Sequence, residues 1–398
     1  MTKPPHFKPT DLRGYARLAF DATSGLTDLV EALHGTILNP LQKRTPGKPI
    51  RTGGITGMVY RSIGGVTNMV GSGVDALLGA LPQVVEEGAA SPEREAIVSA
   101  LNGVMGDYLA ASGNPLALSM TMRHAGKPLT LARAALKKTL PDANGRVLLL
   151  IHGLCMNDLQ WTRAGHNHGA HLADRLGFTP VYLRYNTGLH IADNGRELAA
   201  LLEKLVTAWP VAVKELVIVG HSMGGLVARS ACLSVDVPSE AETKRTPRWR
   251  SLLKRMVFLG TPHFGAPLER GGHWVDLLLG ATPWSAPFAQ LGKIRSGGIT
   301  DLRHGTFFDT AHYPLPRGVR CYAVAATTSR ATDKQGLVQK KLWGDGLVPI
   351  NSALGIHPDP GLTLKFSTHR QLVVHGTNHL DMLSSGTVST RMEHWLRG

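Results

Sequence analysis

A G-H-S-M-G sequence at residues 220–224 restricts the fold of this chain more than any other feature. The strand-like residues 215–219 come directly before it, and residues 225–230 after it favour a helix. A serine on so sharp a strand-to-helix turn needs neighbours without bulky side chains, and the two flanking glycines meet that need. The segment therefore predicts a nucleophile elbow, with Ser222 as the candidate nucleophile.

Apolar segments of strand length alternate with helical patterns from residue 146 onward. They lie at residues 147–151, 180–183, 216–219, 256–259, 319–325 and 372–374. Such alternation is typical of a mainly parallel sheet with helices on both faces. The residues before about 140 read as helical or irregular, without strand-like alternation. We therefore expect an N-terminal helical extension over residues 1–140 and an α/β catalytic domain over residues 141–398.

An apolar stripe runs through part of the expected N-terminal extension. Its members recur every three or four residues, which is the spacing of one helix face, and they are Ile55, Val59, Ile63, Val66, Val70, Val74, Leu77 and Leu81. One interpretation is a helix that packs on the catalytic domain. The other is an interfacial helix that lies on lipid, although its polar face has few of the basic residues typical of such anchors. Peripheral contact with a membrane or lipid surface therefore stays open.

Charge and cysteine content exclude several classes of protein. The chain has 43 Lys and Arg against 29 Asp and Glu, a net charge of +14, but the basic residues are scattered. Without an aromatic-interleaved basic patch, we expect no nucleic-acid partner. Three cysteines without paired spacing indicate neither a disulfide framework nor a zinc site. Because no segment has the apolar length of a signal peptide or a spanning helix, we expect a cytoplasmic location.

A serine nucleophile needs a general base, and two histidines near the end of the chain are candidates. His379 follows the strand-like residues 372–374 on a loop, where the histidine of this kind of sheet lies. His375 directly ends the same strand and is its rival.

The base needs an acid that orients its imidazole ring. Asp345 lies in a glycine-flanked loop after the strand-like residues 319–325. The chain order of Ser222, Asp345 and His379 is the order expected for a sheet with this nucleophile turn. The weaker candidates for the acid are Asp301, Asp309 and Asp333.

Two backbone N–H groups must bind the oxyanion that forms during acyl transfer. Met223 directly follows the nucleophile and supplies one N–H group. The second is expected from the loop after the strand at residues 147–151, where Leu154 follows an H-G turn. His152 of that turn is expected to brace the loop, and Cys155 to line the site.

Five motifs in order resemble the lipase and esterase branch of the α/β-hydrolase superfamily. They are the H-G-L of residues 152–154, the elbow of residues 220–225, G-T-P-H-F-G-A-P at 260–267, G-D-G-L-V at 344–348 and N-H-L-D at 378–381. Within this branch, the motifs are similar to those of bacterial triacylglycerol lipases and of deacylases of glycosylphosphatidylinositol lipids. The resemblance covers about residues 146–398, and it implies that Asp345 and His379 complete a catalytic triad. Asp381 matches a calcium-binding position of some such lipases, but no second acidic ligand accompanies it, so we expect no metal and no cofactor.

The same resemblance implies an apolar lid insertion over residues 268–318. Trp274, Trp284 and Phe288 are its candidate substrate-binding residues, and paired glycines flank it as hinges. The alternative is a packed helical segment that does not move.

Three histidines form an H-x-H-x-x-H cluster, with His166, His168 and His171 as its members. No cysteine or carboxylate completes a metal site, except Asp174 as a distant candidate. We interpret the cluster as the polar start of a helix near the mouth of the substrate site.

These patterns predict a serine hydrolase that cleaves carboxylic esters, with lipid-like acyl esters as substrates, through an acyl-enzyme. An acyltransferase would use the same triad with an alcohol in place of water. A non-catalytic scaffold or lipid-surface protein is the alternative from another class. An intracellular polyester depolymerase is a further enzyme of the same type.

Overall fold

The computed structural model describes residues 10–11, 13–18, 92–236, 246–265, 296–304, 313–330 and 344–397. These residues fall into two compact units. One comprises the described parts of residues 89–110 and 118–398, and the other comprises residues 111–117 with those described up to residue 18. In the smaller unit, Asn114 Nδ2 donates a hydrogen bond to the carbonyl of Gly14. The apolar stripe over residues 55–81 lies outside the described residues.

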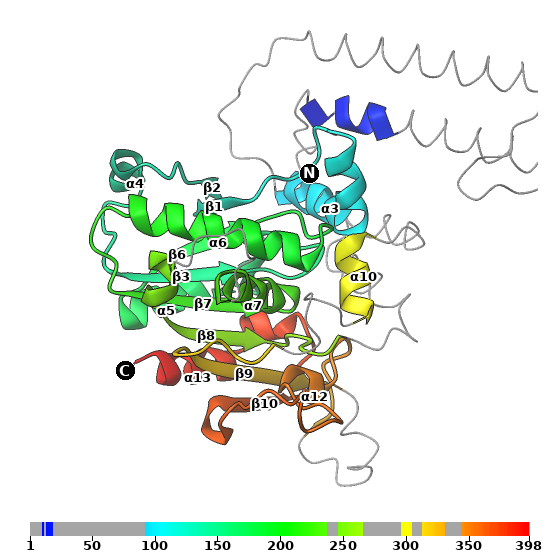
Figure 1. Cartoon of the computed structure of the whole chain (residues 1–398), viewed down its shortest axis with the longest axis vertical. Coiled ribbons are helices and arrows are strands. Elements are labelled where there is room, and N and C mark those ends of the chain that lie inside the picture. Colours follow the sequence, from blue (N-terminus) through cyan, green and yellow to red (C-terminus); the bar gives the residue numbers. More distant parts are fainter. Residues whose placement is uncertain are drawn as a thin grey trace, which may run out of the picture. The chain divides into compact units, whose positions relative to one another are not determined.

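The larger unit is built on a sheet whose eight strands, among the described residues, run in the order β10-β9-β8-β7-β3-β6-β1-β2 (Figure 1). Their bounds are Thr121–His124 for β1, Lys127–Pro128 for β2, Arg146–Ile151 for β3, Thr179–Arg184 for β6, Glu215–His221 for β7, Leu253–Leu259 for β8, Arg320–Thr327 for β9 and Gln371–His375 for β10. All neighbours from β6 to β10 pair in parallel. The prediction of a mainly parallel sheet is confirmed.

Strands β1 and β2 show that the expectation of no strand before residue 140 was wrong. β1 pairs antiparallel with β6, and β2 folds back on β1 through a turn at Ala125 and Gly126. Both turn residues have positive φ. Positive φ at both positions is typical of two-residue hairpin turns, whose backbone twist matches that of the flanking strands. β1 has only four residues, of which two adjacent ones, Met122 and Arg123, are buried. So short a segment has no alternation for a sequence pattern to detect.

Helices cover the sheet in two packed pairs. α6 (Ile191–Ala208) packs against α7 (Met223–Asp236), and α5 (His168–Leu176) packs against α13 (Gly386–Leu396). The other described α-helices are α3 (Pro92–Ala111), α4 (Arg133–Thr139), α8 (Arg248–Leu252), α10 (Gly297–His304) and α12 (Ile350–Ala353). Short 3-10 helices η1 (Asp158–Trp161), η4 (Thr368–Arg370) and η5 (Asp381–Ser384), and a small hairpin of β4 (Thr162–Arg163) and β5 (His166–Asn167), complete this unit.

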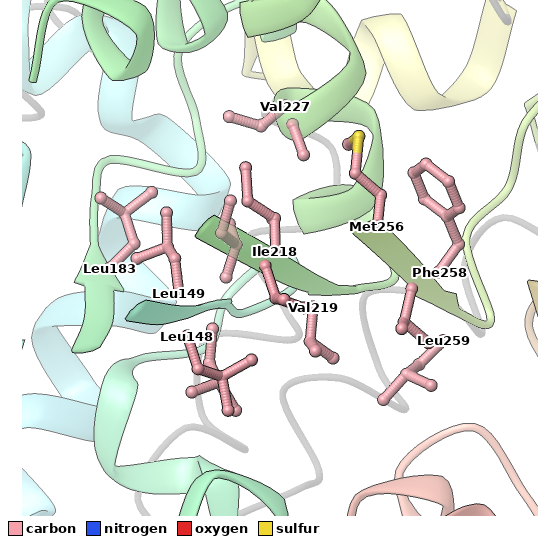
Figure 2. Close-up of a cluster of buried hydrophobic side chains, with 14 of the residues drawn as sticks. Leu148, Leu149, Leu183, Ile218, Val219, Val227, Met256, Phe258 and Leu259 are labelled. Atoms are coloured by element: carbon pink, nitrogen blue, oxygen red, sulfur yellow. The ribbon is translucent and has the colours of Figure 1, made fainter. Parts of the chain in front are cut away.

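The core lies on both faces of the central strands. Figure 2 shows Ile218 on the same side of the sheet as Val227 of α7, whereas Val219 points to the opposite side. Both strand residues are fully buried, as is β3 from Val147 to Ile151. Strands buried on both faces read as continuous apolar runs, which explains why these segments were visible in the sequence.

The connections of β3 determine where a site can form. The chain leaves β3 for β6 on one side and later returns to β7 on the other side of β3. In open α/β sheets, ligands bind in the crevice at the carboxyl ends of the strands where the order reverses in this way. Ser222 directly follows β7, and residues 152–156 directly follow β3, so both lie at that crevice.

Replacement of Gly224 by alanine tests how closely α7 approaches β3. A Cβ atom at Gly224 would lie 2.3 Å from the carbonyl oxygen of Ile151. We expect Gly224→Ala to lower the free energy of unfolding in urea by about 1–3 kcal/mol, because backbone atoms must move apart. Gly386→Ala is the matched control, since a Cβ there would meet nothing within 4 Å. Equal stability of the two variants would contradict this packing.

Candidate active site

Ser222 lies on a strained turn between β7 and α7. Its φ is +53°, in the left-handed region that residues other than glycine rarely adopt. Its N–H donates to the carbonyl of Leu259 at 2.8 Å, which holds the turn against the end of β8. A Cβ at Gly220 would lie 2.6 Å from the Cα of Gly225, so the turn has no space for a side chain there. The structure therefore has the elbow geometry that the sequence predicted.

The Ser222 side chain lies beside the loop that follows β3. A Cβ at Gly153 would approach the Cβ of Ser222 to 3.0 Å. Ser222 is fully buried, and its Oγ makes no hydrogen bond to any described residue. The structure therefore brings Ser222 next to the predicted oxyanion loop without a hydrogen bond from its hydroxyl to a base. Catalytic hydrogen bonds are often long without substrate and tighten when it binds.

His379 and Asp345 form a short, buried pair. His379 Nδ1 lies 2.7 Å from Asp345 Oδ2, and both side chains are at most 1% exposed. Asp345 Oδ1 accepts from the N–H groups of Leu347 and Val348 at 3.0 and 2.8 Å. Because a carboxylate only accepts hydrogen bonds, Nδ1 carries the proton and Nε2 is the acceptor in the neutral ring. That is the tautomer a general base needs.

The rival residues that the structure describes do not take part in this pair. His375 ends β10 with an exposed side chain. Asp301 accepts instead from His190 Nδ1 at 3.0 Å and from the N–H of Ile191 at 2.8 Å. Asp309 and Asp333 lie outside the described residues. Among the described candidates, the structure therefore pairs Asp345 with His379.

The His379 loop reaches the strand ends next to the elbow. A Cβ at Gly260, which follows β8, would lie 3.1 Å from His379 Nδ1. The ring of His221, the residue before Ser222, lies 4.7 Å from the ring of His379 between centroids. Segments more than 150 residues apart therefore meet at the carboxyl ends of β7 and β8.

Two aromatic rings fix the start of the loop after β3. His152 Nδ1 donates to the carbonyl of Gly153 at 2.9 Å, and the Tyr185 hydroxyl donates to the carbonyl of His152 at 2.9 Å. The two rings stack with centroids 4.6 Å apart. Burial lowers the pKa of His152 to about 4, so its ring is neutral near pH 7. Through these contacts, His152 holds the start of the loop after β3 in place.

The next turn of this loop is held by residues that the sequence analysis missed. Cys155 has a φ of +59°, and its N–H donates to Thr187 Oγ1 at 3.1 Å. A Cβ at Gly103 of α3 would lie 2.2 Å from Cys155 Sγ, so α3 packs directly on the loop. Burial raises the pKa of the Cys155 thiol to about 12, and such a thiol is a poor nucleophile. No local sequence signal connects Thr187 or Gly103 with this loop.

The two candidate oxyanion donors, Met223 and Leu154, lie in segments next to Ser222. Met223 is the first residue of α7, and the first N–H groups of a helix have no partner within the helix. The partial positive charge of a helix N-terminus also favours a developing negative charge. Leu154 lies between Gly153, which contacts Ser222, and the strained Cys155. Both candidate oxyanion donors thus belong to segments that border the nucleophile.

Asp381, the residue that matches a calcium-binding position, has an arginine partner. Its Oδ1 accepts from Arg163 Nη2 at 3.0 Å, and its Oδ2 accepts from Asn378 Nδ2 at 2.6 Å. Across the part of the chain that the structure describes, no group of three or more His, Cys, Asp or Glu side chains is arranged so that it could hold a metal ion. The Arg163 guanidinium thus balances the charge of Asp381.

The histidine cluster joins α5 to α13. α5 begins at His168, as predicted, with Asn167 as its N-cap. His168 Nε2 donates to the carbonyl of Met382, and His168 Nδ1 lies 2.9 Å from Ser389 Oγ. His166 Nε2 contacts the same hydroxyl at 2.8 Å. The cluster therefore supports η5, which begins two residues after His379.

Most of the expected lid lies outside the described residues, including Trp274, Trp284 and Phe288. The described part contains α10, where the N–H of Gly297 donates to Asp107 Oδ2 at 2.9 Å and Ser296 Oγ donates to the carbonyl of Gly103 at 2.7 Å.

In the described ranges, none of the helices combines the length and apolarity needed to cross a bilayer.

A model of the alpha/beta hydrolase family matches residues 148–388, more than half of the chain. The match begins in β3 and ends in α13, so it includes the elbow, Asp345 and His379. The comparison with curated proteins gave no match.

Several solved structures also match this chain. A lipase from Bacillus licheniformis in its mature form is 18% identical with a TM-score of 0.43, over 64% of this chain and 92% of that protein. An esterase from the archaeon Pyrobaculum calidifontis is 12% identical with a TM-score of 0.38, over 63% and 74% of the two chains. Lipase B from Aspergillus fumigatus is 15% identical with a TM-score of 0.30, over 58% and 45%.

The burial of His168 predicts a loss of stability in acid. Burial lowers the pKa of His168 from 6.5 to about 4. Between these values the unfolded chain binds the proton more readily, so the free energy of unfolding falls as the pH drops through this window. At 1.36 kcal/mol per pKa unit, the contribution of His168 is at most about 3 kcal/mol.

Urea unfolding of His168→Gln between pH 7.5 and 4 measures this contribution. We expect the stability gap between wild type and His168→Gln to narrow as the pH falls. The control is His394→Gln on the exposed side of α13, which should keep the wild-type pH dependence. A gap that stays constant from pH 7.5 to 4 would show that His168 does not cause the acid sensitivity.

Proposed function

Because the chain belongs to the alpha/beta hydrolase family, we propose that it is a serine hydrolase that cleaves carboxylic esters through an acyl-enzyme. The observation that carries this proposal is the 2.7 Å contact between His379 Nδ1 and Asp345 Oδ2, located at the strand ends next to Ser222. A base held in the correct tautomer beside a serine on a strained turn is the arrangement that acyl transfer requires. The motif resemblance to lipases and esterases supports the choice of an ester as substrate.

In the first half of the reaction, Ser222 Oγ attacks the acyl carbonyl carbon. The hydroxyl proton passes to His379 Nε2, and the ring becomes an imidazolium whose charge Asp345 stabilises. As the tetrahedral intermediate collapses, the bond to the leaving alkoxide breaks, and His379 returns the proton to it. The alcohol departs and the acyl group stays on Ser222.

In the second half, a water molecule replaces the alcohol. His379 takes a proton from the water, the hydroxide attacks the acyl carbon, and the bond to Ser222 Oγ breaks as the proton returns to the serine. The products are the free acid and the original enzyme. In both halves, the N–H groups of Met223 and Leu154 would bind the oxyanion, a contribution that is typically worth about 3–4 kcal/mol per donor.

We assign lipid-like acyl esters as the substrate class within this proposal. Trp274, Trp284 and Phe288 lie in the apolar part of residues 268–318, and apolar linings suit acyl chains. The apolar stripe over residues 55–81 would then provide peripheral contact with a lipid surface in the cytoplasm. The apolar residues of 268–318 are supported by the sequence and by the lipase resemblance, whereas the stripe over residues 55–81 is supported by the sequence alone.

Removal of the nucleophile tests the reaction. We expect Ser222→Ala to abolish hydrolysis of p-nitrophenyl acetate and butyrate and labelling by a fluorophosphonate, with an unchanged circular dichroism spectrum. Asp345→Asn should keep the fold but lose about 1,000- to 10,000-fold in kcat, because the amide favours the wrong tautomer of His379. The exposed Asp359→Asn is its control and should retain full activity. Undiminished labelling of Ser222→Ala would remove Ser222 from the mechanism.

A panel of p-nitrophenyl esters from acetate to palmitate, with and without phosphatidylcholine vesicles, tests the substrate class. Lipid-like specificity predicts that kcat/KM rises with acyl length and that vesicles raise the rate on long chains. A preference for acetate that vesicles do not change would indicate an esterase for small soluble esters. Analysis of the products with added glycerol distinguishes hydrolysis from acyl transfer to an alcohol.

A further inference from the structure

The side chain of His221, the residue directly before the nucleophile, reaches the loop that carries the base. Its Nε2 lies 3.0 Å from the carbonyl oxygen of His379. The two rings lie 4.7 Å apart between centroids at an angle of 46°. His221 is fully buried, so this hydrogen bond is shielded from water. A single side chain thus connects the elbow to a residue 158 positions further along the chain.

The chemistry of this contact fixes the state of the His221 ring. A carbonyl oxygen only accepts hydrogen bonds, so Nε2 must carry a proton and donate it. Burial lowers the pKa of His221 well below its ordinary value, and the neighbouring His379 lowers it further, so the ring is neutral. When His379 becomes an imidazolium, the neutral His221 ring therefore adds no second positive charge beside it.

The backbone of His379 is held at both of its polar groups. Its N–H donates to the carbonyl of Asp345 at 3.0 Å, and its carbonyl accepts from His221. The ring itself donates to the Asp345 carboxylate. Asp345 therefore orients His379, and His221 connects it directly to the segment that bears Ser222.

We propose that His221 is a positioning residue that holds the His379 backbone at the correct distance from Ser222 through its Nε2–H donor. This inference rests on the proposed function of Ser222 and His379, and it adds a role for the variable position inside the G-x-S-x-G motif. His221 Nδ1 makes no hydrogen bond to any described residue, and its Nε2 bonds to the backbone of His379. It acts through the carbonyl of His379, and a displacement of about 1 Å in such a group can cost about a hundredfold in rate.

A role in packing alone is the competing explanation. The His221 ring contacts Trp161 edge-on with centroids 6.4 Å apart, and it lies next to Gly153. Packing requires a side chain of suitable volume, whereas positioning requires a donor at the place of Nε2. Nδ1 of His221 makes no hydrogen bond to any described residue, so a replacement needs only the one donor.

Two amide variants separate these explanations. In His221→Gln, the side-chain N–H₂ group can occupy the place of Nε2 and donate to the same carbonyl. In His221→Asn, the amide ends near the place of Nδ1 and is too short to reach it. The two side chains are both polar and neutral and differ by one methylene group, so a change in general polarity affects both alike.

We expect His221→Asn to lower kcat on p-nitrophenyl butyrate by about 10- to 100-fold, with KM changed less than about threefold. The apparent pKa of the base in the pH profile of kcat/KM should also shift, because the surroundings of His379 change. His221→Gln should recover kcat to within a few fold of wild type and restore the profile. Urea unfolding at pH 7.5 confirms that both variants are folded under the assay conditions.

A proton NMR measurement gives a result that does not depend on turnover. The short bond between His379 and Asp345 should give a downfield Nδ1–H resonance. We expect this resonance in wild type and in His221→Gln, and its loss or broadening in His221→Asn. Wild-type kcat and an intact resonance in His221→Asn would overturn the proposal, and so would a His221→Gln variant as impaired as His221→Asn.

The failure of the proposed function would look different. If wild type hydrolyses no ester and a fluorophosphonate does not label Ser222, the serine hydrolase assignment is wrong, and the resonance still decides whether His221 positions His379. If wild type is active, Ser222→Ala is inactive and His221→Asn matches wild type in kcat, pH profile and resonance, only the role of His221 is wrong.

Discussion

The turn at Ser222 is the constraint on which the other parts of the site depend. Its positive φ lets α7 begin immediately after β7, and Gly224 then lies so close to β3 that a Cβ atom would overlap the carbonyl of Ile151. The same close approach brings Gly153 against the Ser222 side chain. A strand, a helix and a loop meet at one point because glycines leave space there. Strain of about 1–3 kcal/mol at such a turn persists only where the surrounding fold enforces it.

Neutral, buried histidines are the main supports of the segments around this turn. His152, His168 and His221 each donate one hydrogen bond to a backbone carbonyl, of Gly153, Met382 and His379 in that order. Burial lowers the pKa of all three. As neutral donors, they hold the loops after β3 and β10 without adding a positive charge beside His379. The arrangement also means that acid weakens several supports together, since each ring becomes harder to keep neutral as the pH falls.

The parts of the fold that the sequence predicted are those with a local pattern. Strands buried on both faces appear as apolar runs, and the elbow, Asp345 and His379 each lie in a short motif whose order along the chain matches the family. β1 was missed because a strand of only four residues carries no alternation. Tyr185, Thr187 and Gly103 were missed for another reason. Their contacts with the loop after β3 depend on which segments become neighbours in space, and no spacing along the chain encodes that.

The hydrogen bond of His221 is another contact that the sequence could not predict. In the G-x-S-x-G pattern it occupies a position that any side chain could fill, so the sequence gives it no role. In the structure, its ring is turned toward the loop after β10 and bonds to the residue proposed as the base. The alpha/beta hydrolase framework places the ends of its strands predictably, but hydrogen bonds between those ends are visible only in three dimensions.

A crystal structure of the enzyme after reaction with an alkyl phosphonate would test the central claim most directly, because the phosphonate resembles the tetrahedral intermediate. The account predicts phosphorus bonded to Ser222 Oγ, one phosphonyl oxygen within hydrogen-bond distance of the N–H groups of Met223 and Leu154, and His379 Nε2 within hydrogen-bond distance of the adduct. An adduct on a different residue, or an adduct on Ser222 with His379 out of reach, would contradict it.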